Sequence, residues 1–593
     1  MAGSLLNRRV LVIGGLIAVI IALLLIFSGD LVAPVVSRKI KAAVLKGSDS
    51  LYQVSFSALH LNIFTGTAEL VDASLIVDTA LLLRRQGLGT APAKVFAGRA
   101  SRVLVSGLHP FRYWFNKKLE VGQLVISDPR VSLSVYKGVS VKSGRAKTLY
   151  EMLSGEFKLI SVGSIRLEHA QLGYVNYRTI KPEALYLREL TLVANDLLID
   201  SATQRDKGRT LYCRDITTTL RNFSGVSADG IYRYKLRSAE FSTLDARVVV
   251  RGASLAPLPP AEFFVKSKED RFSMAIDSMV VEGFNYRSFL RDHFLLVKRL
   301  RAFRGSLGIF SNPHGVLQRT DRIITYPNYI IRKLKTHFTV DTLDLAGIDV
   351  NYSEFNQDPG KTGTIDFKDT RARFLNITNQ EDRLKVNGVC KVKLSSYFMG
   401  RAKLSLAFKF NLTDKVYGYA YSGHLAPMPL VAVNTVLRPL ALGEVKKGEL
   451  RSLDFSIAGD QSGAKGNLSL LYNDLSIALL NINYGKKVIK SFIANTFVVK
   501  PDNPDVGSKL PRFAKVVFIR PKNYPFFKSL WFTLLSGIKP CAGVGYAVKP
   551  DPAKLLSKKE QKAKDKALRK AIKAKEKADK QFKEQLKKKG LKQ

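Results

Sequence analysis

Cysteine is scarce in this chain, and the three residues present lie far apart at Cys213, Cys390 and Cys541. They form no Cys-x-x-Cys pair and no closely spaced series, so the sequence indicates neither a zinc module nor a small scaffold held by disulfides. Histidine is also rare: there are seven, and no two stand three or four positions apart. No metal site is therefore predicted.

The motifs of the common enzyme classes are missing as well. The sequence holds no P-loop, no Gly-x-Gly-x-x-Gly after a strand, no His-Glu-x-x-His and no Gly-x-Ser-x-Gly. Its clustered carboxylates, as in "DTLDLAGID" and "DFKD", stand beside turns or on the wet faces of strands. We predict no catalytic residues, no metal and no cofactor, and a protein that is not an enzyme.

Acidic residues are few: the chain has 49 Asp and Glu against 94 Lys and Arg, so its net charge is +45. Such an excess can indicate nucleic-acid binding. Here, however, the basic residues are spread along the whole chain, with no RNP-type aromatic motif and no recognition helix. An anionic phospholipid surface suits this distribution better. We expect membrane phospholipids as partners, with other envelope or outer-membrane proteins as further candidates, and no nucleic acid.

Only one long apolar run occurs, the eighteen residues Val10–Phe27. At 1.5 Å per residue a helix of this length covers about 27 Å, close to the hydrocarbon core of a bilayer. A cleavable signal peptide is the alternative, but its apolar core is usually shorter. Arg8 and Arg9 favour a cytoplasmic N-terminus and an exported chain, although Arg38, Lys39 and Lys41 follow the run. The predicted anchor residues are Val10, Leu11, Val12, Ile13, Leu16, Ile17, Val19, Ile20, Ile21, Leu23, Leu24, Leu25, Ile26 and Phe27.

An apolar spacing recurs beyond this run. Counted from Val121, Val162 or Val340, apolar side chains fall at +3, +5, +10 and +12. The same offsets appear from Leu187 and Leu236, and more weakly from Ile276. Residues two apart on a strand share a face, so each pair predicts a short strand. The four residues between the pairs, such as "SDPR" and "AGID", are turn-like. Each unit therefore predicts strand, turn, strand.

From Tyr52 to about residue 500 the dominant pattern is short alternating strands, with helices expected only near Lys147–Leu153, Arg287–Leu300 and Leu430–Leu442, after a juxtamembrane helix at Ser37–Lys46. No βαβ rhythm is present, so we predict an elongated, curved, mostly antiparallel β-sheet. Its apolar faces either form an open groove or pack on one another as sandwiches. The candidate groove lining is Leu124, Ile126, Val131, Leu133, Ile165, Leu167, Leu190, Leu192, Leu343, Leu345, Leu404, Leu406, Phe408 and Phe410.

Two further features lie near the C-terminus. The segment Tyr524–Ile538 has an apolar stripe at helical spacing, too short to span a bilayer, which either caps the end of the sheet or lies on a membrane interface. The stripe consists of Phe526, Phe527, Leu530, Trp531, Leu534, Leu535 and Ile538. From Lys554 onward, 17 Lys and Arg accompany only 5 Asp and Glu, as in a solvated helix or a disordered basic tail.

Taken together, the N-terminal anchor, the strand-rich "LHLNIFTGTAELVDASLIVD" and the repeated unit resemble the AsmA-like family of bacterial envelope proteins. The most specific part of the resemblance is the block Leu425–Leu480. Its matching positions are Asn434, Pro439, Gly443, Gly448, Leu453, Phe455, Gly466, Tyr472 and Leu475. The resemblance covers most of residues 1–545 and implies a groove-shaped or taco-shaped β-sheet that shields lipid chains between membranes and has no enzyme site.

The predicted organisation has six parts. They are a cytoplasmic stub and transmembrane anchor (1–30), a juxtamembrane helix (31–50), a repetitive β-sheet groove (51–424), an AsmA-like C-terminal block (425–500), a capping segment with an amphipathic helix (501–552) and a Lys-rich tail (553–593). The expected function is to bind or conduct phospholipid for outer-envelope biogenesis, from a single-pass position in the bacterial inner membrane with the bulk of the chain in the periplasm. The alternative is a structural or assembly factor that binds envelope proteins.

Overall fold

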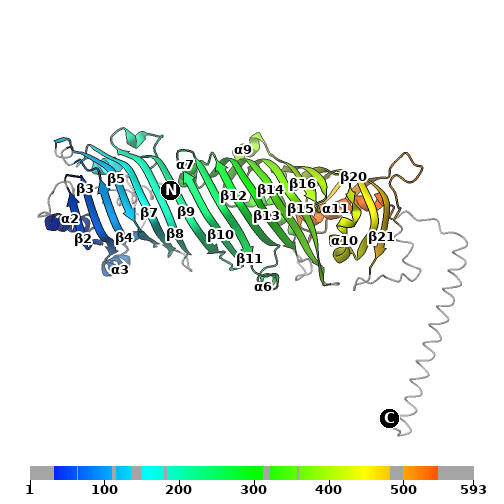
Figure 1. The fold of residues 1–593 in the computed structure, drawn as a ribbon, viewed down its shortest axis with the longest axis horizontal. Helices are drawn as coiled ribbons and strands as arrows, with labels where there is room; N and C mark the ends of the chain where they lie inside the picture. Colours follow the sequence, from blue (N-terminus) through cyan, green and yellow to red (C-terminus); the bar gives the residue numbers. More distant parts are fainter. Residues whose placement is uncertain are drawn as a thin grey trace, which may run out of the picture.

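A single sheet dominates the molecule. The computed structural model describes residues 33–544 except 63, 110–111, 113–114, 137–148, 156, 179–182, 312–320, 357–359 and 481–498. Its 22 strands belong to one sheet, which runs as a long twisted ribbon from the blue to the yellow part of the chain (Figure 1). The mainly β, mostly antiparallel class is confirmed. No described helix is long and apolar enough to cross a bilayer, and the predicted anchor Val10–Phe27 and the Lys-rich tail lie outside the described residues.

The elements have the following bounds. The strands are β1 (Tyr52–Ser55), β2 (Ala58–Asn62), β3 (Thr67–Val77), β4 (Lys94–Ser106), β5 (Lys118–Ser127), β6 (Arg130–Val135), β7 (Leu159–Asn176), β8 (Glu183–Ile199), β9 (Cys213–Val226), β10 (Tyr232–Ser242), β11 (Arg247–Pro257), β12 (Arg271–Glu282), β13 (Leu295–Ser311), β14 (Phe338–Asn356), β15 (Lys361–Thr378), β16 (Val389–Phe398), β17 (Ala402–Asn411), β18 (Tyr419–Leu425), β19 (Met428–Pro429), β20 (Gly443–Gly459), β21 (Gly463–Leu479) and β22 (Phe513–Ile519). The helices are α2 (Ala33–Gly47), α3 (Thr79–Gly87), α5 (Leu149–Leu153), η2 (Thr203–Arg205), α6 (Pro260–Lys266), α7 (Tyr286–Asp292), η3 (Arg322–Thr325), α8 (Pro327–Lys333), α9 (Glu381–Val386), η4 (Leu430–Val433), α10 (Asn434–Ala441) and α11 (Phe526–Cys541).

The strands follow one another across the sheet in chain order. Three rows are shared by two short strands: β1 and β2 both pair with β3, β5 and β6 both lie between β4 and β7, and β18 and β19 both pair with β20. Parallel pairing occurs where β5 and β6 meet β7 and where β13 meets β14. At about 4.8 Å per row, the sheet is on the order of 90 Å long.

Most long strands carry one residue with a positive φ angle near their middle. In the units that start at Val121, Val162 and Val340 this residue stands seven positions on, at Asp128, His169 and Gly347. Such a residue inserts one extra position into the strand as a β-bulge. The step from +5 to +10 is odd, so without the bulge the second apolar pair would point to the opposite face. With the bulge, both pairs share one face.

Most of the predicted strand–turn–strand units are therefore corrected. The unit from Val121 does form two strands, β5 and β6, which lie end to end between β4 and β7. The "turn" residues of the units from Val162, Leu187 and Val340 lie inside the continuous strands β7, β8 and β14, and only the unit from Leu236 forms a hairpin, β10–β11. In the unit from Ile276, Tyr286 lies in α7. Turn-like residues occur in these units because the left-handed conformation of a bulge favours the same residue types as a turn.

The helix predictions had mixed outcomes. The helix predicted at Ser37–Lys46 is found as α2, and Leu430–Leu442 corresponds to η4 and α10. The predicted helix at Arg287–Leu300 is wrong in its second half, because α7 ends at Asp292 and β13 begins at Leu295. The short helices α3, α6, α8 and α9 were not predicted. With nine residues or fewer, they hold too few turns to show a helical period.

The bulges form a continuous line across the sheet. We call this the bulge line, and its members with positive φ are Asp72, Asp128, His169, Glu189, Asn222, Gly252, Arg304, Gly347 and Asp369. Polar side chains link many of its neighbours. Ser101 donates to Asp128 at 2.9 Å, and Asn222 donates to Glu189 at 2.7 Å.

We expect the stability of the sheet at the bulge line to depend on residues that tolerate the left-handed backbone conformation. Gly347 has a φ of +71°, which costs a residue with a side chain about 1–2 kcal/mol. Gly347→Val should lower the stability by roughly this amount, while Gly347→Asn should lose less, because Asn tolerates this conformation. The midpoint of urea unfolding measures both. Equal losses for the two variants would contradict the argument.

Candidate functional site

One face of the sheet is apolar along its whole length. We call it the inner face, because α11 and the segment that follows α5 pack against it. Strand register aligns its side chains into a cross-strand line that runs from β2 to β22, which we call the apolar row. Its members are Leu59, Leu70, Val103, Ile126, Leu167, Leu192, Thr218, Phe241, Val248, Val281, Leu300, Leu343, Phe374, Val392, Phe408, Tyr421, Ile457, Gly466 and Val516.

A second line runs beside the first from β7 to β22. Its members are Ala170, Leu190, Leu220, Ala239, Val250, Met279, Ala302, Leu345, Ala372, Leu394, Leu406, Gly423, Phe455, Leu468 and Ala514. The structure thus places the predicted lining residues Leu192, Leu343 and Phe408 on one line. It places Leu190, Leu345 and Leu406 on its neighbour.

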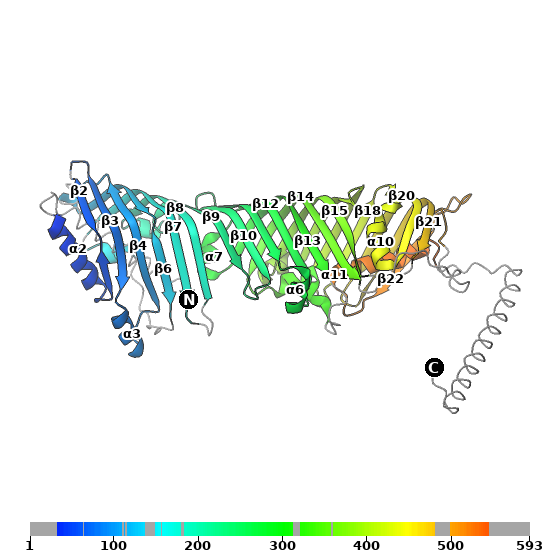
Figure 2. The ribbon, with the colours of Figure 1, turned by 60° about the horizontal axis from the view of Figure 1, so that its bottom comes forward.

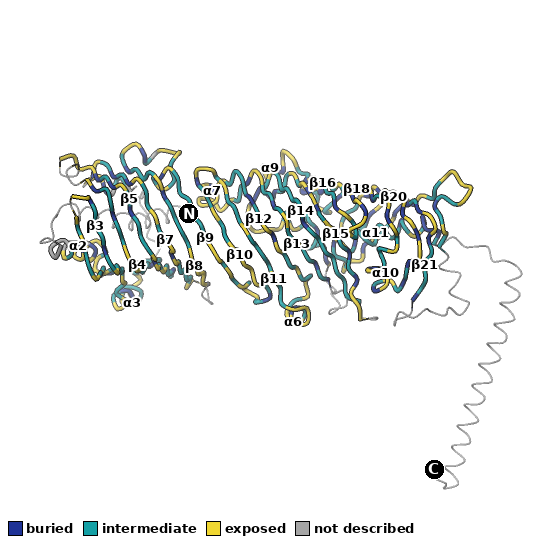
Figure 3. Tube along the Cα trace, in the orientation of Figure 1, coloured by how far each residue is buried: buried dark blue, intermediate teal, exposed yellow. Residues whose placement is uncertain are grey.

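Burial changes along the apolar row. At its C-terminal end Val392, Ile457 and Val516 are buried, with 3%, 2% and 1% of their surface exposed. Leu192 on β8 and Leu343 on β14 are only half-buried, as are the members of the row between them. Figure 3 shows the same change from dark blue in the last strands to teal in the middle. Among the described helices, those that flank the middle strands, α6 and α7, lie at the edges of the sheet (Figure 1).

Helix α11 covers the C-terminal end of the inner face. Its Phe526 is buried, with its ring edge-on to those of Tyr326 at 5.1 Å and Tyr419 at 5.4 Å. Gly537 lies so close to the sheet that a Cβ there would stand 2.8 Å from Val516. The helix lies along the last strands in Figure 2. The inner face is therefore filled by protein at this end.

The other predicted residues of the capping stripe take different positions. Leu530, Leu534 and Ile538 pack against the C-terminal core, Trp531 and Leu535 are half-buried, and Phe527 is 53% exposed. This arrangement places the stripe over the end of the sheet.

An ion pair ties α11 to the sheet where the open part of the inner face begins. Lys528 on α11 contacts Glu354 on β14 at 3.0 Å, and both side chains are largely buried. Nearby, burial raises the pKa of Tyr352, and the charge of Glu354 raises it further. Burial also raises the pKa of Asp270, although Arg322 opposes that shift. Polar groups thus mark the boundary between the open section and the filled end.

The N-terminal end has its own smaller core. Ile40 and Val44 of α2 are buried, and Ile40 belongs to the same core as Leu153 of α5 and the nearby Phe157. Leu124 is buried in this core, just as Leu404 and Phe410 are buried in the C-terminal one. The other predicted lining residues of the N-terminal half, Ile126, Val131, Leu133, Ile165 and Leu167, are half-buried. Sequence periodicity assigned each residue to a face, but it did not reveal which parts of the face are covered.

The described part of the chain offers neither a metal-binding group nor a reactive thiol. No group of His, Cys, Asp and Glu there could hold a metal ion. All three cysteines are buried free thiols, and burial raises the pKa of Cys213 to about 11 and that of Cys390 to about 12. Thiols with such pKa values are poor nucleophiles at neutral pH.

Comparison with known proteins does not assign the chain to a family. No protein-family model matches the chain, and no curated protein matches it.

Two adjacent residues test the role of α11. Phe526→Ala should destabilise the protein by about 3–5 kcal/mol, because it opens a cavity among buried rings. Phe527→Ala, which removes a ring of the same size from a mainly exposed site, should cost much less, about 0.5 kcal/mol. Thermal unfolding of the two variants measures the difference, and similar losses would show that α11 does not fill the end of the sheet.

Proposed function

We propose that this protein binds acyl lipid and guides it along the middle section of the inner face, as the resemblance to AsmA-like envelope proteins implies. The observation that supports the proposal best is the apolar row, which continues across the sheet and is only partly buried from β8 to β14. Soluble proteins rarely leave apolar patches of this extent bare. Such a surface needs a cover, and the described residues supply only part of one in the middle. The ring of Tyr286 of α7 lies 5.4 Å from that of Phe241 of the row, and Ile276, Ala302 and Ile348 form a small buried cluster beside it.

Acyl chains meet the physical requirements of this surface. They need no hydrogen bonds, and each buried CH₂ contributes about 0.8 kcal/mol. The row offers aliphatic and aromatic contacts with few polar interruptions, so a chain could move from strand to strand without a large barrier. In this proposal the curved sheet forms a taco-like trough, the two cores close its ends, and lipid occupies the section between them.

The proposed setting follows from the sequence. The apolar run Val10–Phe27 would anchor the chain in the bacterial inner membrane, and the sheet would lie in the periplasm. The proposal includes no catalytic step, and membrane phospholipids would be both substrate and neighbour.

A second candidate function is supported by the last strand. β22 pairs only with β21 among the described strands, and the side chains of Phe513, Val517 and Ile519 on its outward face are 66%, 70% and 83% exposed. Open sheet edges with exposed apolar residues are sites where another strand can add. A structural or assembly factor that binds envelope proteins would use such an edge.

The lipid proposal predicts different effects on the two faces of one strand. Leu345→Glu places a charge on the inner face of β14, whereas Thr342→Glu places it on the outer face. We expect the first variant to lose at least about fivefold of the lipid that co-purifies with the protein, because a carboxylate is expensive to bury against acyl chains. The second should retain it. Mass spectrometry of extracted lipid gives the readout, with circular dichroism to verify folding. Lipid-free wild-type protein would rule the proposal out.

The second candidate predicts a different phenotype. Val517→Lys changes an exposed position on β22 and should leave both the fold and the lipid content unchanged. If the edge holds a protein partner, crosslinking in intact cells should lose a band that Lys515→Arg retains. An unchanged crosslinking pattern would argue against a partner at this edge.

A further inference from the structure

The outer face of the N-terminal half carries a row of arginines on adjacent strands. Arg99 on β4 stands directly opposite Arg130 on β6, and Arg130 stands opposite Gln171 on β7. On β8, Arg188 follows Leu187, the partner of Leu172, so it continues this row beside Gln171. All four side chains are exposed. By alternation they point away from the inner face, where Val131 and Leu172 lie.

This arrangement is unfavourable for the protein alone. Like charges directly opposite each other on neighbouring strands destabilise a sheet. Among the described residues, none of Arg99, Arg130 and Arg188 forms an ion pair.

Three carboxylates in or beside the bulge line have other partners. Asp128 accepts a hydrogen bond from Ser101 at 2.9 Å and pairs with His169 at 3.7 Å. Glu189 accepts from Asn222 at 2.7 Å. Glu168 pairs with Arg166 at 3.8 Å. The row therefore keeps its positive charge available for an external group.

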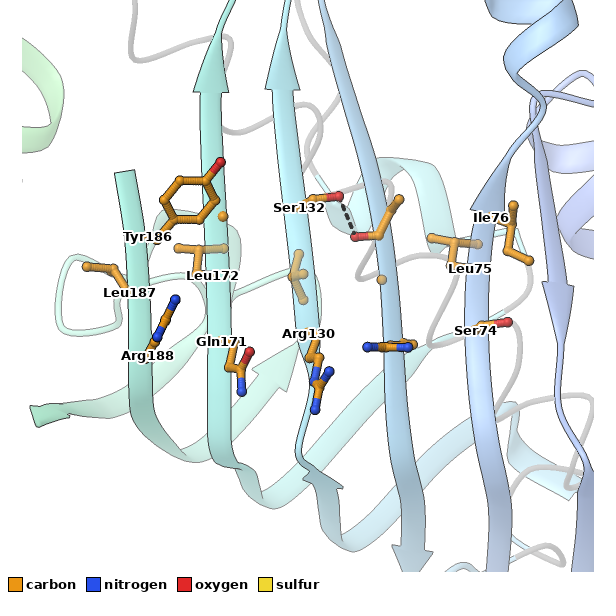
Figure 4. Close-up of a pocket in the computed structure, with 15 residues that line it drawn as sticks. Ser74, Leu75, Ile76, Arg130, Ser132, Gln171, Leu172, Tyr186, Leu187 and Arg188 are labelled. Atoms are coloured by element: carbon orange, nitrogen blue, oxygen red, sulfur yellow. Dashed lines mark hydrogen bonds between the residues drawn. The ribbon is translucent and has the colours of Figure 1, made fainter. Parts of the chain in front are cut away.

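A hollow of about 560 Å³ lies at this row. Figure 4 shows Arg130, Gln171 and Arg188 on neighbouring strands along one border of it, with Tyr186 and Ser132 further along the same strands. Ile76 and Tyr186, which also line the hollow, are 54% and 61% exposed. A cationic border beside exposed apolar and aromatic side chains matches an amphiphile whose charged group is anionic.

We propose that Arg99, Arg130 and Arg188 form a binding site for the phosphate of an anionic phospholipid headgroup, with Ile76 and Tyr186 in contact with the apolar part of the same lipid. Guanidinium groups bind phosphate through paired hydrogen bonds. A bound phosphate also relieves the repulsion between Arg99 and Arg130. The site lies on the face opposite the apolar row, so it does not depend on the occupancy of that row.

The test compares two triple variants of the full chain in a non-ionic detergent. The first carries Arg99→Gln, Arg130→Gln and Arg188→Gln. The control carries Arg221→Gln, Lys235→Gln and Arg251→Gln, which removes the same charge from exposed positions on β9, β10 and β11. Calorimetric titration measures the binding of dihexanoyl phosphatidylglycerol, dihexanoyl phosphatidylcholine and inorganic phosphate to each protein.

We expect the wild type to bind phosphatidylglycerol at least about tenfold more tightly than phosphatidylcholine, and the first variant to lose this preference. The control should retain it within about twofold. Equal losses in both variants would show that only the net charge matters, and no preference in the wild type would also overturn the proposal. Inorganic phosphate that binds as tightly as phosphatidylglycerol would assign the row to free phosphate instead of a lipid.

Two further measurements keep the test decisive. Arg130→Gln alone should raise the midpoint of thermal unfolding in the absence of lipid, because it removes the repulsion with Arg99. A lower midpoint would contradict the argument even if the triple variant failed to fold. In Leu345→Glu the headgroup preference should survive, so failure of the lipid-guiding function and failure of this site are distinguishable.

Discussion

The structure depends on one backbone constraint, the insertion of a single residue at the same level in neighbouring strands. Strand side chains alternate between two faces, so a long strand keeps one apolar face only if its pattern never changes phase. Here the pattern does change phase, and the bulge at His169 or Gly347 restores the face at the same point of the strand. Bulges also bend strands and increase their twist. A line of them bends the whole sheet along one crease, and this crease separates two apolar bands that still share the inner face.

Register then joins the separate strands into one surface. The parallel pairs are important because they place equal positions of two units side by side: Leu124 meets Ile165, and Val131 meets Leu172. The same alignment joins β13 to β14. Antiparallel neighbours continue the lines through their hairpins. The apolar row thus results from many local pairings, most of which match apolar partners, and no single long-range contact is needed to maintain it.

Much of this could be predicted from the sequence. The spacing from Val162 and Val340 predicted the strands and the face of each apolar residue, because the period of two is a local property. The bulges were misread as turns, because both place a residue in the left-handed αL conformation and therefore favour the same residue types. The start of β13 was missed because Leu295–Leu300 was assigned to the helix predicted at Arg287–Leu300. Cross-strand neighbours such as Arg99 and Arg130 depend on register, which the spacing within one strand does not determine.

The two faces of the sheet differ in what they have little of: covering protein on the inner face and carboxylates on the outer one. Between the N-terminal and C-terminal cores the inner face has little covering protein among the described residues, and most of its apolar row there is only partly buried. The outer face is short of carboxylates, because the chain has 49 acidic residues for 94 basic ones. Several acidic groups at the bulge line are engaged there, and among the described residues Arg99, Arg130 and Arg188 form no ion pair. In the two proposals made above, the acyl chains of one lipid would cover the inner face, and the phosphate of a separate anionic lipid would pair with the arginines of the outer face. The two proposals thus name the same class of ligand, although one rests on the apolar geometry of the sheet and the other on its charge.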